Sequence, residues 1–135
     1  MAPSEHPNAV LVRRLIAAFT AQDRDEIVAL IADDCVWRVP GDNALAGEYV
    51  GRAAVLRLFG TLKRRFTGPA RFDIIDIAAS ADRAITFQYG VIVVDEVETR
   101  LKECLVYRIE AGQVTEVDEF QFEQSRFDAL FMKSG

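Results

Sequence analysis

The sequence predicts an α+β fold in which helices pack on one face of a curved sheet. Three segments with apolar residues at helical spacing occupy the first half of the chain. From residue 70 onward, strand-type segments rich in β-branched and aromatic residues follow one another with only short turns between them. Helices followed by consecutive strands are typical of α+β structures. With no linker, repeat or low-complexity tract, residues 1–135 are predicted to form a single domain.

Helix start signals precede each of the three helical segments. Asn8 is a good N-cap for a first helix that ends near Gln22, and Asp23 caps a second, short helix. A third helix runs from Arg52 to Phe66, with its apolar residues along one side. A last turn of helix is expected at residues 125–131.

The remaining elements read as strands. Residues 35–39 form a short strand that Pro40-Gly41 ends, and residues 42–50 form a loop with a short strand near Leu45. Four longer strands follow at residues 70–79, 83–94, 98–109 and 113–122. Within the second of them, alternate apolar residues give one apolar face: Ile85, Phe87, Tyr89, Val91 and Val93.

Two glutamates in the last two strands are the main candidates for chemistry. Residues 110–112 suit a three-residue turn, which pairs Ile109 with Gln113 and thereby places Glu103 opposite Glu119. Opposed carboxylates on a partly apolar face repel, so at least one pKa should rise. Such a pair can hold a proton at neutral pH, as acid/base chemistry requires. A one-residue slip in the turn would separate the pair.

Composition argues against several classes of partner and cofactor. The 16 basic and 21 acidic residues give a net charge of −5, so nucleic acid and anionic membranes are not expected partners. His6 is the only histidine and lies in a leader, residues 1–7, that we expect to be mobile. Histidine-dependent catalysis and a metal site are therefore not expected, and without a glycine-rich phosphate loop no cofactor is predicted. The N-terminus shows no secretory signal, which predicts a cytoplasmic protein.

Several stretches resemble a known superfamily. Residues 29–37, Pro40-Gly41, residues 46–52 and the closing stretch 111–116 are similar to the SnoaL-like branch of the nuclear-transport-factor-2-like superfamily. The order of elements agrees from about residue 8 to residue 122. The resemblance implies a cystatin-like roll: a cone-shaped, mainly antiparallel sheet wrapped around three helices, with a deep apolar cavity. Ketosteroid isomerase, limonene epoxide hydrolase and polyketide cyclases are similar to it in layout.

The resemblance transfers few catalytic residues. Leu15, Val39 and Leu105 stand where ketosteroid isomerase has its tyrosine and two aspartates, so steroid isomerisation by that mechanism is not expected. Phe87 and Tyr89 lie on the strand that supplies an arginine and an aspartate in limonene epoxide hydrolase. The last-strand aspartate of the hydrolases and cyclases matches Glu119.

Two functions follow from the residues and the resemblance together. The first is a cofactor-free acid/base enzyme for a small, largely apolar carbonyl or epoxide substrate, of cyclase, isomerase, dehydratase or epoxide hydrolase type. Glu119 would be the base and Glu103 the proton donor. The alternative is a ligand-binding or dimerisation module without catalysis. In either case the expected cavity lining is Leu15, Trp37, Val39, Phe59, Phe87, Tyr89, Leu105, Tyr107, Val117 and Gln121.

The outer face of the last two strands predicts self-association. It carries an apolar group that is too large to leave open, namely Cys104, Val106, Val114, Phe120 and Phe122. Charged residues of both signs would surround it: Lys102, Arg108, Glu116 and Asp118. We therefore expect a homodimer that pairs through this face.

Overall fold

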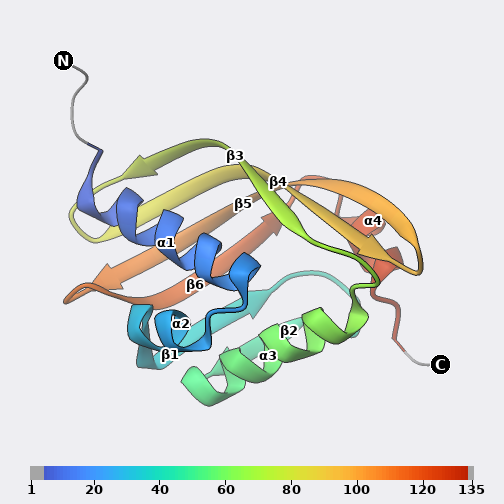
Figure 1. The fold of residues 1–135 in the computed structure, drawn as a ribbon, viewed down its shortest axis with the longest axis horizontal. Coiled ribbons are helices and arrows are strands. Elements are labelled where there is room, and N and C mark those ends of the chain that lie inside the picture. The colour runs from blue at the N-terminus through green and yellow to red at the C-terminus, as the bar shows by residue number, and fades with distance from the viewer. Residues whose placement is uncertain (1–4, 134–135) are drawn as a thin grey trace.

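In the computed structural model, which describes residues 5–133, six strands form one curved sheet with four helices around it (Figure 1). The strand order is β2-β1-β6-β5-β4-β3, and every pair is antiparallel except β1 with β6. This confirms the predicted α+β class. In chain order the elements are α1 (Pro7–Ala21), α2 (Arg24–Leu30), β1 (Ile31–Val39), β2 (Gly47–Val50), α3 (Arg52–Arg65), β3 (Arg71–Ala79), β4 (Arg83–Val94), β5 (Val97–Glu110), β6 (Gln113–Gln121) and α4 (Gln124–Leu130).

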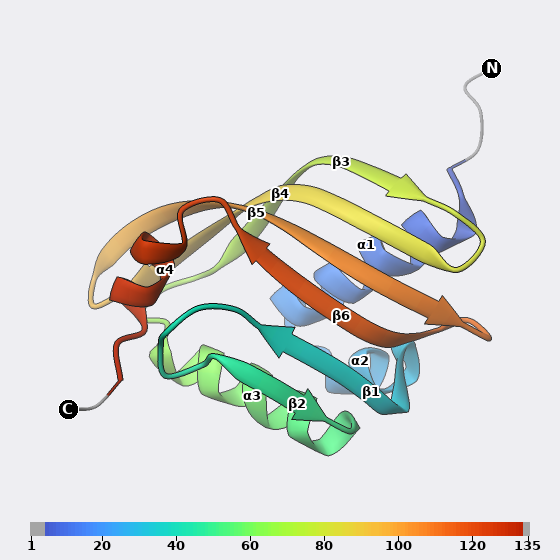
Figure 2. The same ribbon diagram turned by 180° about the vertical axis from the view of Figure 1, so that it is seen from behind.

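The helices α1, α2 and α3 lie on the same, concave side of the sheet, as the two opposite views show (Figures 1 and 2). The short helix α4 lies at one end of the sheet, beside the turn between β4 and β5. The core therefore sits between the concave face and the helices, and the opposite, convex face of β4, β5 and β6 carries no helix of the described residues.

The start of α1 differs from the expected N-cap. His6 is the cap, and its ring Nδ1 accepts a hydrogen bond from the backbone N–H of Asn8 at 3.0 Å. Pro7 takes the first helical position, where its missing N–H is not needed. The Asn8 side chain instead donates to two carbonyl oxygens of the β3–β4 turn, at 2.8 and 3.2 Å. Of the leader expected at residues 1–7, residues 1–4 lie outside the described part, and the rest anchors α1.

Strand β1 begins four residues earlier than expected. Ile31 already has extended backbone and pairs with Val114 of β6, although the predicted strand began at Cys35. Ile31 is fully buried, so contact with β6 overrides the local preference for a turn at Asp33-Asp34. The β1–β6 register then shifts before it reaches Val36, which marks an irregularity in the strand.

The buried face of β4 is the opposite of its apolar face. The alternating apolar side chains that the sequence singles out all lie on the convex side. Val91 is the one among them that is buried. Phe87 stacks there on Phe122, with ring centroids 5.7 Å apart, and the Arg100 guanidinium lies 3.7 Å from the Tyr89 ring centroid. The buried positions on the concave side are Ala84, Thr86, Gln88, Gly90, Ile92 and Val94.

The β5–β6 turn has two residues, and three were predicted. Glu110 pairs with Gln113, and the residues between them, Ala111 and Gly112, have φ values of 51° and 75°. Two consecutive left-handed residues are the requirement of the type I′ turns that favour tight hairpins. The pairing near the turn is therefore one residue away from the predicted match of Ile109 with Gln113.

A bulge in β6 shifts the same hairpin by one further residue. Arg108 pairs with Glu116 while Ile109 pairs with Val114, which leaves Thr115 as the extra residue. Val114 is consequently fully buried, so its expected place on the convex face is wrong.

Beyond the bulge the two shifts add up to two residues, and the alternation of faces is restored. Glu103 pairs with Gln121, and Leu105 pairs with Glu119. The predicted direct opposition of Glu103 and Glu119 is therefore wrong. Both carboxyls nevertheless remain on the concave face as diagonal neighbours, because a shift of two residues keeps each side chain on its side.

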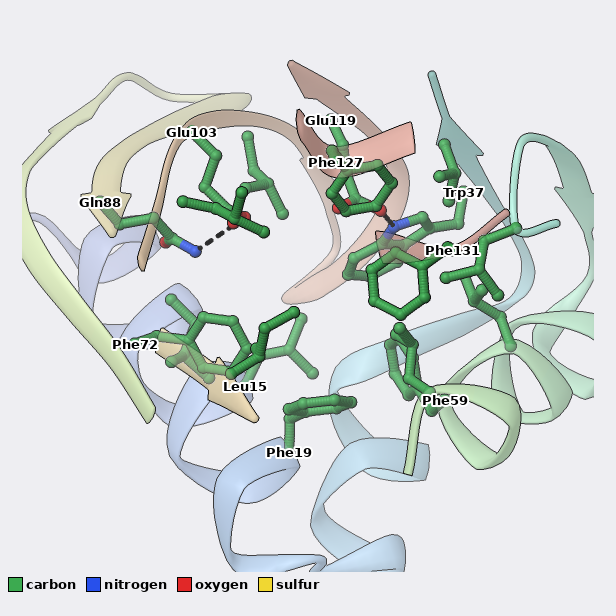
Figure 3. A pocket seen from close by; sticks show the side chains of 18 of the residues that line it. Leu15, Phe19, Trp37, Phe59, Phe72, Gln88, Glu103, Glu119, Phe127 and Phe131 are labelled. Atoms are coloured by element: carbon green, nitrogen blue, oxygen red, sulfur yellow. Dashed lines mark hydrogen bonds between the residues drawn. The ribbon is translucent and has the colours of Figure 1, made fainter. Parts of the chain in front are cut away.

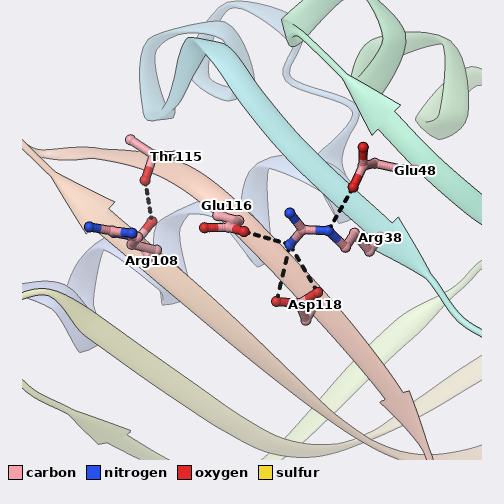
Figure 4. A network of polar contacts seen from close by, with 6 residues as sticks. All are labelled: Arg38, Glu48, Arg108, Thr115, Glu116 and Asp118. Carbon is pink, nitrogen blue, oxygen red and sulfur yellow. Dashed lines mark hydrogen bonds and ion pairs between the residues drawn. The ribbon is translucent and has the colours of Figure 1, made fainter.

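A network of ion pairs connects β1 with β6 across their parallel pairing on the convex face (Figure 4). Arg38 of β1 pairs with Glu48 of β2 at 2.9 Å, and with Glu116 and Asp118 of β6 at 2.5 and 3.1 Å. The two acidic residues of β6, expected to surround a dimer seam, thus have a partner within their own chain.

Candidate functional site

A cavity of about 100 Å³ lies between the concave face of the sheet and the helices. This exceeds the roughly 10–15 Å³ that one water needs, so the space can take a small organic ligand. Most of the lining is aliphatic or aromatic, and the exceptions gather on β4, β5 and β6. The lining residues are Leu15, Ile16, Phe19, Trp37, Val39, Leu45, Leu58, Phe59, Leu62, Phe66, Phe72, Gln88, Ile92, Leu101, Glu103, Leu105, Tyr107, Glu119, Phe127 and Phe131.

Glu119 is held by Trp37. The parallel β1–β6 pairing sets Trp37 beside Val117, two positions before Glu119, and the indole Nε1 donates to Glu119 Oε2 at 2.7 Å. The indole ring system packs nearly perpendicular to the rings of Phe59 and Tyr107, with centroids 5.1 and 6.5 Å away. Burial raises the pKa of Glu119 to about 7, and the hydrogen bond from Trp37 opposes that rise because it favours the carboxylate.

Glu103 is the less exposed of the two glutamates, with 6% of the residue's surface accessible. Gln88, its direct partner on β4, donates from Nε2 to Glu103 Oε2 at 3.3 Å. Burial, together with the nearby charge of Glu119, raises the pKa of Glu103 to about 8, although hydrogen bonding to Gln121 and Gln88 opposes the rise. At neutral pH Glu103 is therefore mainly a carboxylic acid with a proton to donate.

The two carboxyls occupy separate places on the cavity wall (Figure 3). Each carboxyl belongs to a hydrogen-bonded pair of side chains: Gln88 with Glu103, and Trp37 with Glu119. Because the charge of Glu119 disfavours ionisation of Glu103, the pair keeps a proton at pH 7 while Glu119 is partly ionised. An acid and a base thus coexist in one apolar space.

The structure brings most of the predicted site residues together. Besides the two glutamates, six predicted residues line the cavity: Leu15, Trp37, Val39, Phe59, Leu105 and Tyr107. Phe87 and Tyr89 do not, because the buried face of β4 is the other one. Val117 is buried in the core away from the cavity lining, and the amide of Gln121 is buried but outside it.

Sequence reasoning missed much of the lining, including Gln88 and two phenylalanines near the C-terminus. Gln88 was overlooked because the convex residues of β4 are the more hydrophobic ones. Phe127 and Phe131 of the C-terminal segment also line the cavity. Asn43 fixes that segment by donating to Asp128 at 2.7 Å. The spacing of the two phenylalanines, four residues apart, is the signal that would have placed both on one helical face.

Residues 5–133 hold no cluster of three or more histidine, cysteine, aspartate or glutamate side chains arranged to bind a metal. None of the helices in that range is both long enough and apolar enough to span a membrane.

The chain matches the model of the SnoaL-like domain over residues 12–117. An uncharacterized protein of Mycobacterium tuberculosis is 28% identical over 116 residues, which cover 82% of this chain and 85% of that protein. The structure of Bal32a, from a soil-derived mobile gene cassette, has a TM-score of 0.87 at 25% identity, covering 93% of this chain and 96% of Bal32a. A putative SnoaL-like polyketide cyclase from Jannaschia has a TM-score of 0.77 at 15% identity, covering 96% and 95% of the two chains.

The family match covers most of the chain, and the neighbouring structures share the roll architecture, including proteins described as cystatin-like and NTF2-like. The resemblance seen in the sequence is thereby confirmed, and the chain belongs to the SnoaL-like domain family, on an NTF2-like fold.

Proposed function

We propose that this protein is a cofactor-free acid/base enzyme that moves a proton on a small, largely apolar carbonyl compound. The observation that carries the proposal is the pairing of two buried glutamates, with raised pKa values of about 7 and about 8, in one apolar cavity. Catalytic acids and bases work best when their pKa values lie near the operating pH. Membership of a family that includes polyketide cyclases is consistent with such chemistry.

Glu119 would act as the base. Its Oε2 accepts the indole N–H of Trp37, which leaves Oε1 to take a proton from the carbon next to the carbonyl. As that C–H bond breaks, its electron pair forms the C=C bond of an enolate and the carbonyl oxygen gains negative charge. The low polarity of the surrounding side chains strengthens every electrostatic interaction during this step.

Glu103 would act on the oxygen. Its carboxylic O–H donates to the carbonyl oxygen as negative charge develops there, and the Gln88 amide N–H stabilises Glu103 if its proton is transferred. The enol can then take a proton at another carbon, attack a second carbonyl or expel a hydroxyl. Isomerisation, cyclisation and dehydration all begin with this proton abstraction.

The test is proton exchange on a bound model ketone. In D2O, wild-type protein should speed the loss of the α-proton signal of 2-tetralone in its NMR spectrum. Glu119→Gln should lower that rate by roughly 10²- to 10⁴-fold while 2-tetralone still quenches Trp37, the only tryptophan. Glu116→Gln, on the convex side of the same strand, is the matched control and should leave the rate unchanged.

The alternative function, ligand binding without turnover, makes the opposite forecast. It requires that 2-tetralone quench Trp37 while its α-protons exchange no faster than in free solution. That result would contradict the enzymatic proposal.

We also propose that the protein pairs as a homodimer through the convex face. Ile85, Phe120 and Phe122 are 42%, 53% and 56% exposed there, and Phe87 stacks on Phe122 beneath the Lys102 ammonium. An apolar surface of this extent on a sheet face is typical of an interface. A second copy presents the same surface, so a twofold arrangement would cover both.

A further inference from the structure

We infer that Gln88 and Glu103 form a hydroxyl-binding subsite in the cavity, and that Gly90 is the positioning residue that makes room for it. The inference deepens the proposed function, on which it rests for the assignment of the cavity as a reaction site. It identifies the preferred ligand as an apolar molecule with a hydroxyl on a planar carbon: an enol, or its stable counterpart, a phenol.

Only one of the two polar atoms of the Gln88 amide has a hydrogen-bond partner within residues 5–133. Gln88 is 2% exposed, and its Nε2 donates to Glu103 Oε2 at 3.3 Å. The other polar atom, Oε1, is buried and has no hydrogen-bond partner within residues 5–133. Gln88 is one of the residues that line the cavity, and on this inference a bound ligand supplies the missing donor.

Glu103 supplies the complementary group. Burial keeps this carboxyl protonated at neutral pH, since its pKa is raised to about 8. The subsite therefore offers one donor, the Glu103 O–H, and one acceptor, Gln88 Oε1. The buried amide of Gln121, opposite Glu103 on β6, borders the same carboxyl from the other side. A hydroxyl oxygen both accepts and donates, whereas a ketone or ether oxygen only accepts and would leave Gln88 Oε1 unpaired.

This difference favours the product of proton abstraction over the ketone. When Glu103 transfers its proton to the carbonyl oxygen, the new enol O–H can donate to Gln88 Oε1, and the Gln88 amide N–H stabilises the Glu103 carboxylate that is left. The subsite then stabilises the enol-like state more than the starting ketone, as catalysis requires.

Gly90 allows the Glu103 carboxyl to occupy its place. A Cβ at residue 90 would lie 2.7 Å from Glu103 Oε1, too close for the two atoms to coexist. It would also lie 3.5 Å from Phe72, an ordinary contact, so the carboxyl is the group that must move. Glycine is a poor residue for the interior of a strand, and at Gly90 the requirement is space beside the carboxyl.

The surroundings of the subsite favour a flat ligand. The Phe72 ring stands next to Gly90 and makes an edge contact with Phe19, with centroids 5.6 Å apart. Phe19 continues the aromatic wall towards Phe59 at 5.1 Å. A ring system that carries the hydroxyl would stack along this wall while its oxygen reaches Gln88 and Glu103 (Figure 3).

The test compares two probes that differ by the hydroxyl proton, 2-naphthol and 2-methoxynaphthalene. Their affinities are measured at pH 6.5 by quenching of Trp37 and by calorimetry. Wild-type protein should bind 2-naphthol about tenfold more tightly, as one hydrogen bond predicts. Gln88→Leu should reduce this ratio to about one, and so should Gly90→Ala, which displaces the Glu103 carboxyl without changing Gln88.

Two controls separate these effects from damage to the fold. Gly60→Ala adds the same methyl group in α3 at an ordinary 3.5 Å from Arg64, and it should keep the wild-type ratio. Circular dichroism should give Gly90→Ala the spectrum of wild type. An unchanged ratio in Gln88→Leu, or equal binding of both probes by wild-type protein, would overturn the inference.

The outcome is independent of turnover. A hydroxyl preference without α-proton exchange on 2-tetralone would support the subsite and contradict the proposed enzyme. Exchange of the α-protons without any preference for the hydroxyl would support the proposed enzyme and contradict the subsite.

Discussion

The two faces of β4 differ in a way that is unusual for a half-buried sheet. Its concave positions carry Thr86 and Gln88, 0% and 2% exposed, although both side chains are polar. Its convex positions carry Ile85, which is 42% exposed, and the rings of Phe87 and Tyr89. From residue 85 to residue 89, the hydrophobic side chains thus lie on the outer face and the polar ones on the inner face.

Strand β6 repeats the contrast at two neighbouring residues. Glu119 lines the cavity on the concave face, whereas Phe120 is 53% exposed on the other face. Alternation of hydrophobicity identifies the core face only when one face of a sheet is covered. The contrast in β4 and β6 is what a sheet needs if both faces are used, one for a ligand and the other for a second copy.

The largest expected effect comes from making the convex face polar. The double variant Phe120→Asp, Phe122→Asp should convert the proposed dimer to a monomer, because large apolar side chains at an interface centre contribute most of its affinity. Light scattering at micromolar concentration measures the mass. Thr115→Asp, near the turn and away from these rings, is the control. A wild-type protein that is monomeric at that concentration would contradict the proposed pairing.

The two carboxyls on the concave face should make the free energy of unfolding depend on pH. The pKa values of Glu119 and Glu103 rise from an ordinary 4.5 to about 7 and about 8 in the folded protein. Between pH 5 and pH 8 the folded state therefore binds more protons than the unfolded state, and the free energy of unfolding falls as pH rises. The slope for each group is at most about 1.4 kcal/mol per pH unit.

Urea denaturation at half-unit pH steps would measure this loss. Glu103→Gln and Glu119→Gln should each flatten the curve, whereas Glu116→Gln on the convex side should not. A wild-type stability that is constant from pH 5 to pH 8 would show that the two carboxyls titrate normally.

A smaller shift should follow from Trp37→Phe. The substitution keeps an aromatic ring but removes the N–H that donates to Glu119 at 2.7 Å. Since that hydrogen bond lowers the pKa of Glu119, its loss should raise the pKa by about one unit. The pH profile of 2-tetralone exchange should move upward by the same amount. An unmoved profile would mean that the indole does not tune the base.

The smallest effect is expected at the polar network of the convex face. Arg38→Ala removes three ion pairs, but all their side chains are at least 32% exposed. Pairs in that setting are screened by water, so the free energy of unfolding should fall by about 1 kcal/mol or less. Thermal unfolding at low and at high salt measures it. A loss of several kcal/mol would show that the β1–β6 junction depends on this network.

The sequence by itself determined the elements and the face of each glutamate. Helical periodicity located α1 and α3, and turn residues separated the long strands, because these signals are local. Glu103 and Glu119 were assigned to one face correctly even though the predicted register was wrong. The shorter turn and the bulge at Thr115 each moved the pairing by one residue, and two such shifts preserve alternation.

Only the tertiary structure decided which face of β4 is buried and which groups meet there. Hydrophobicity favoured the face with Phe87 and Tyr89, but pairing with β5 turns Gln88 toward Glu103 and leaves those rings outside. The space that Gly90 provides for a carboxyl is equally invisible in the sequence. Such contacts join residues on different strands, so their geometry depends on the exact register and curvature of the sheet and not on local composition.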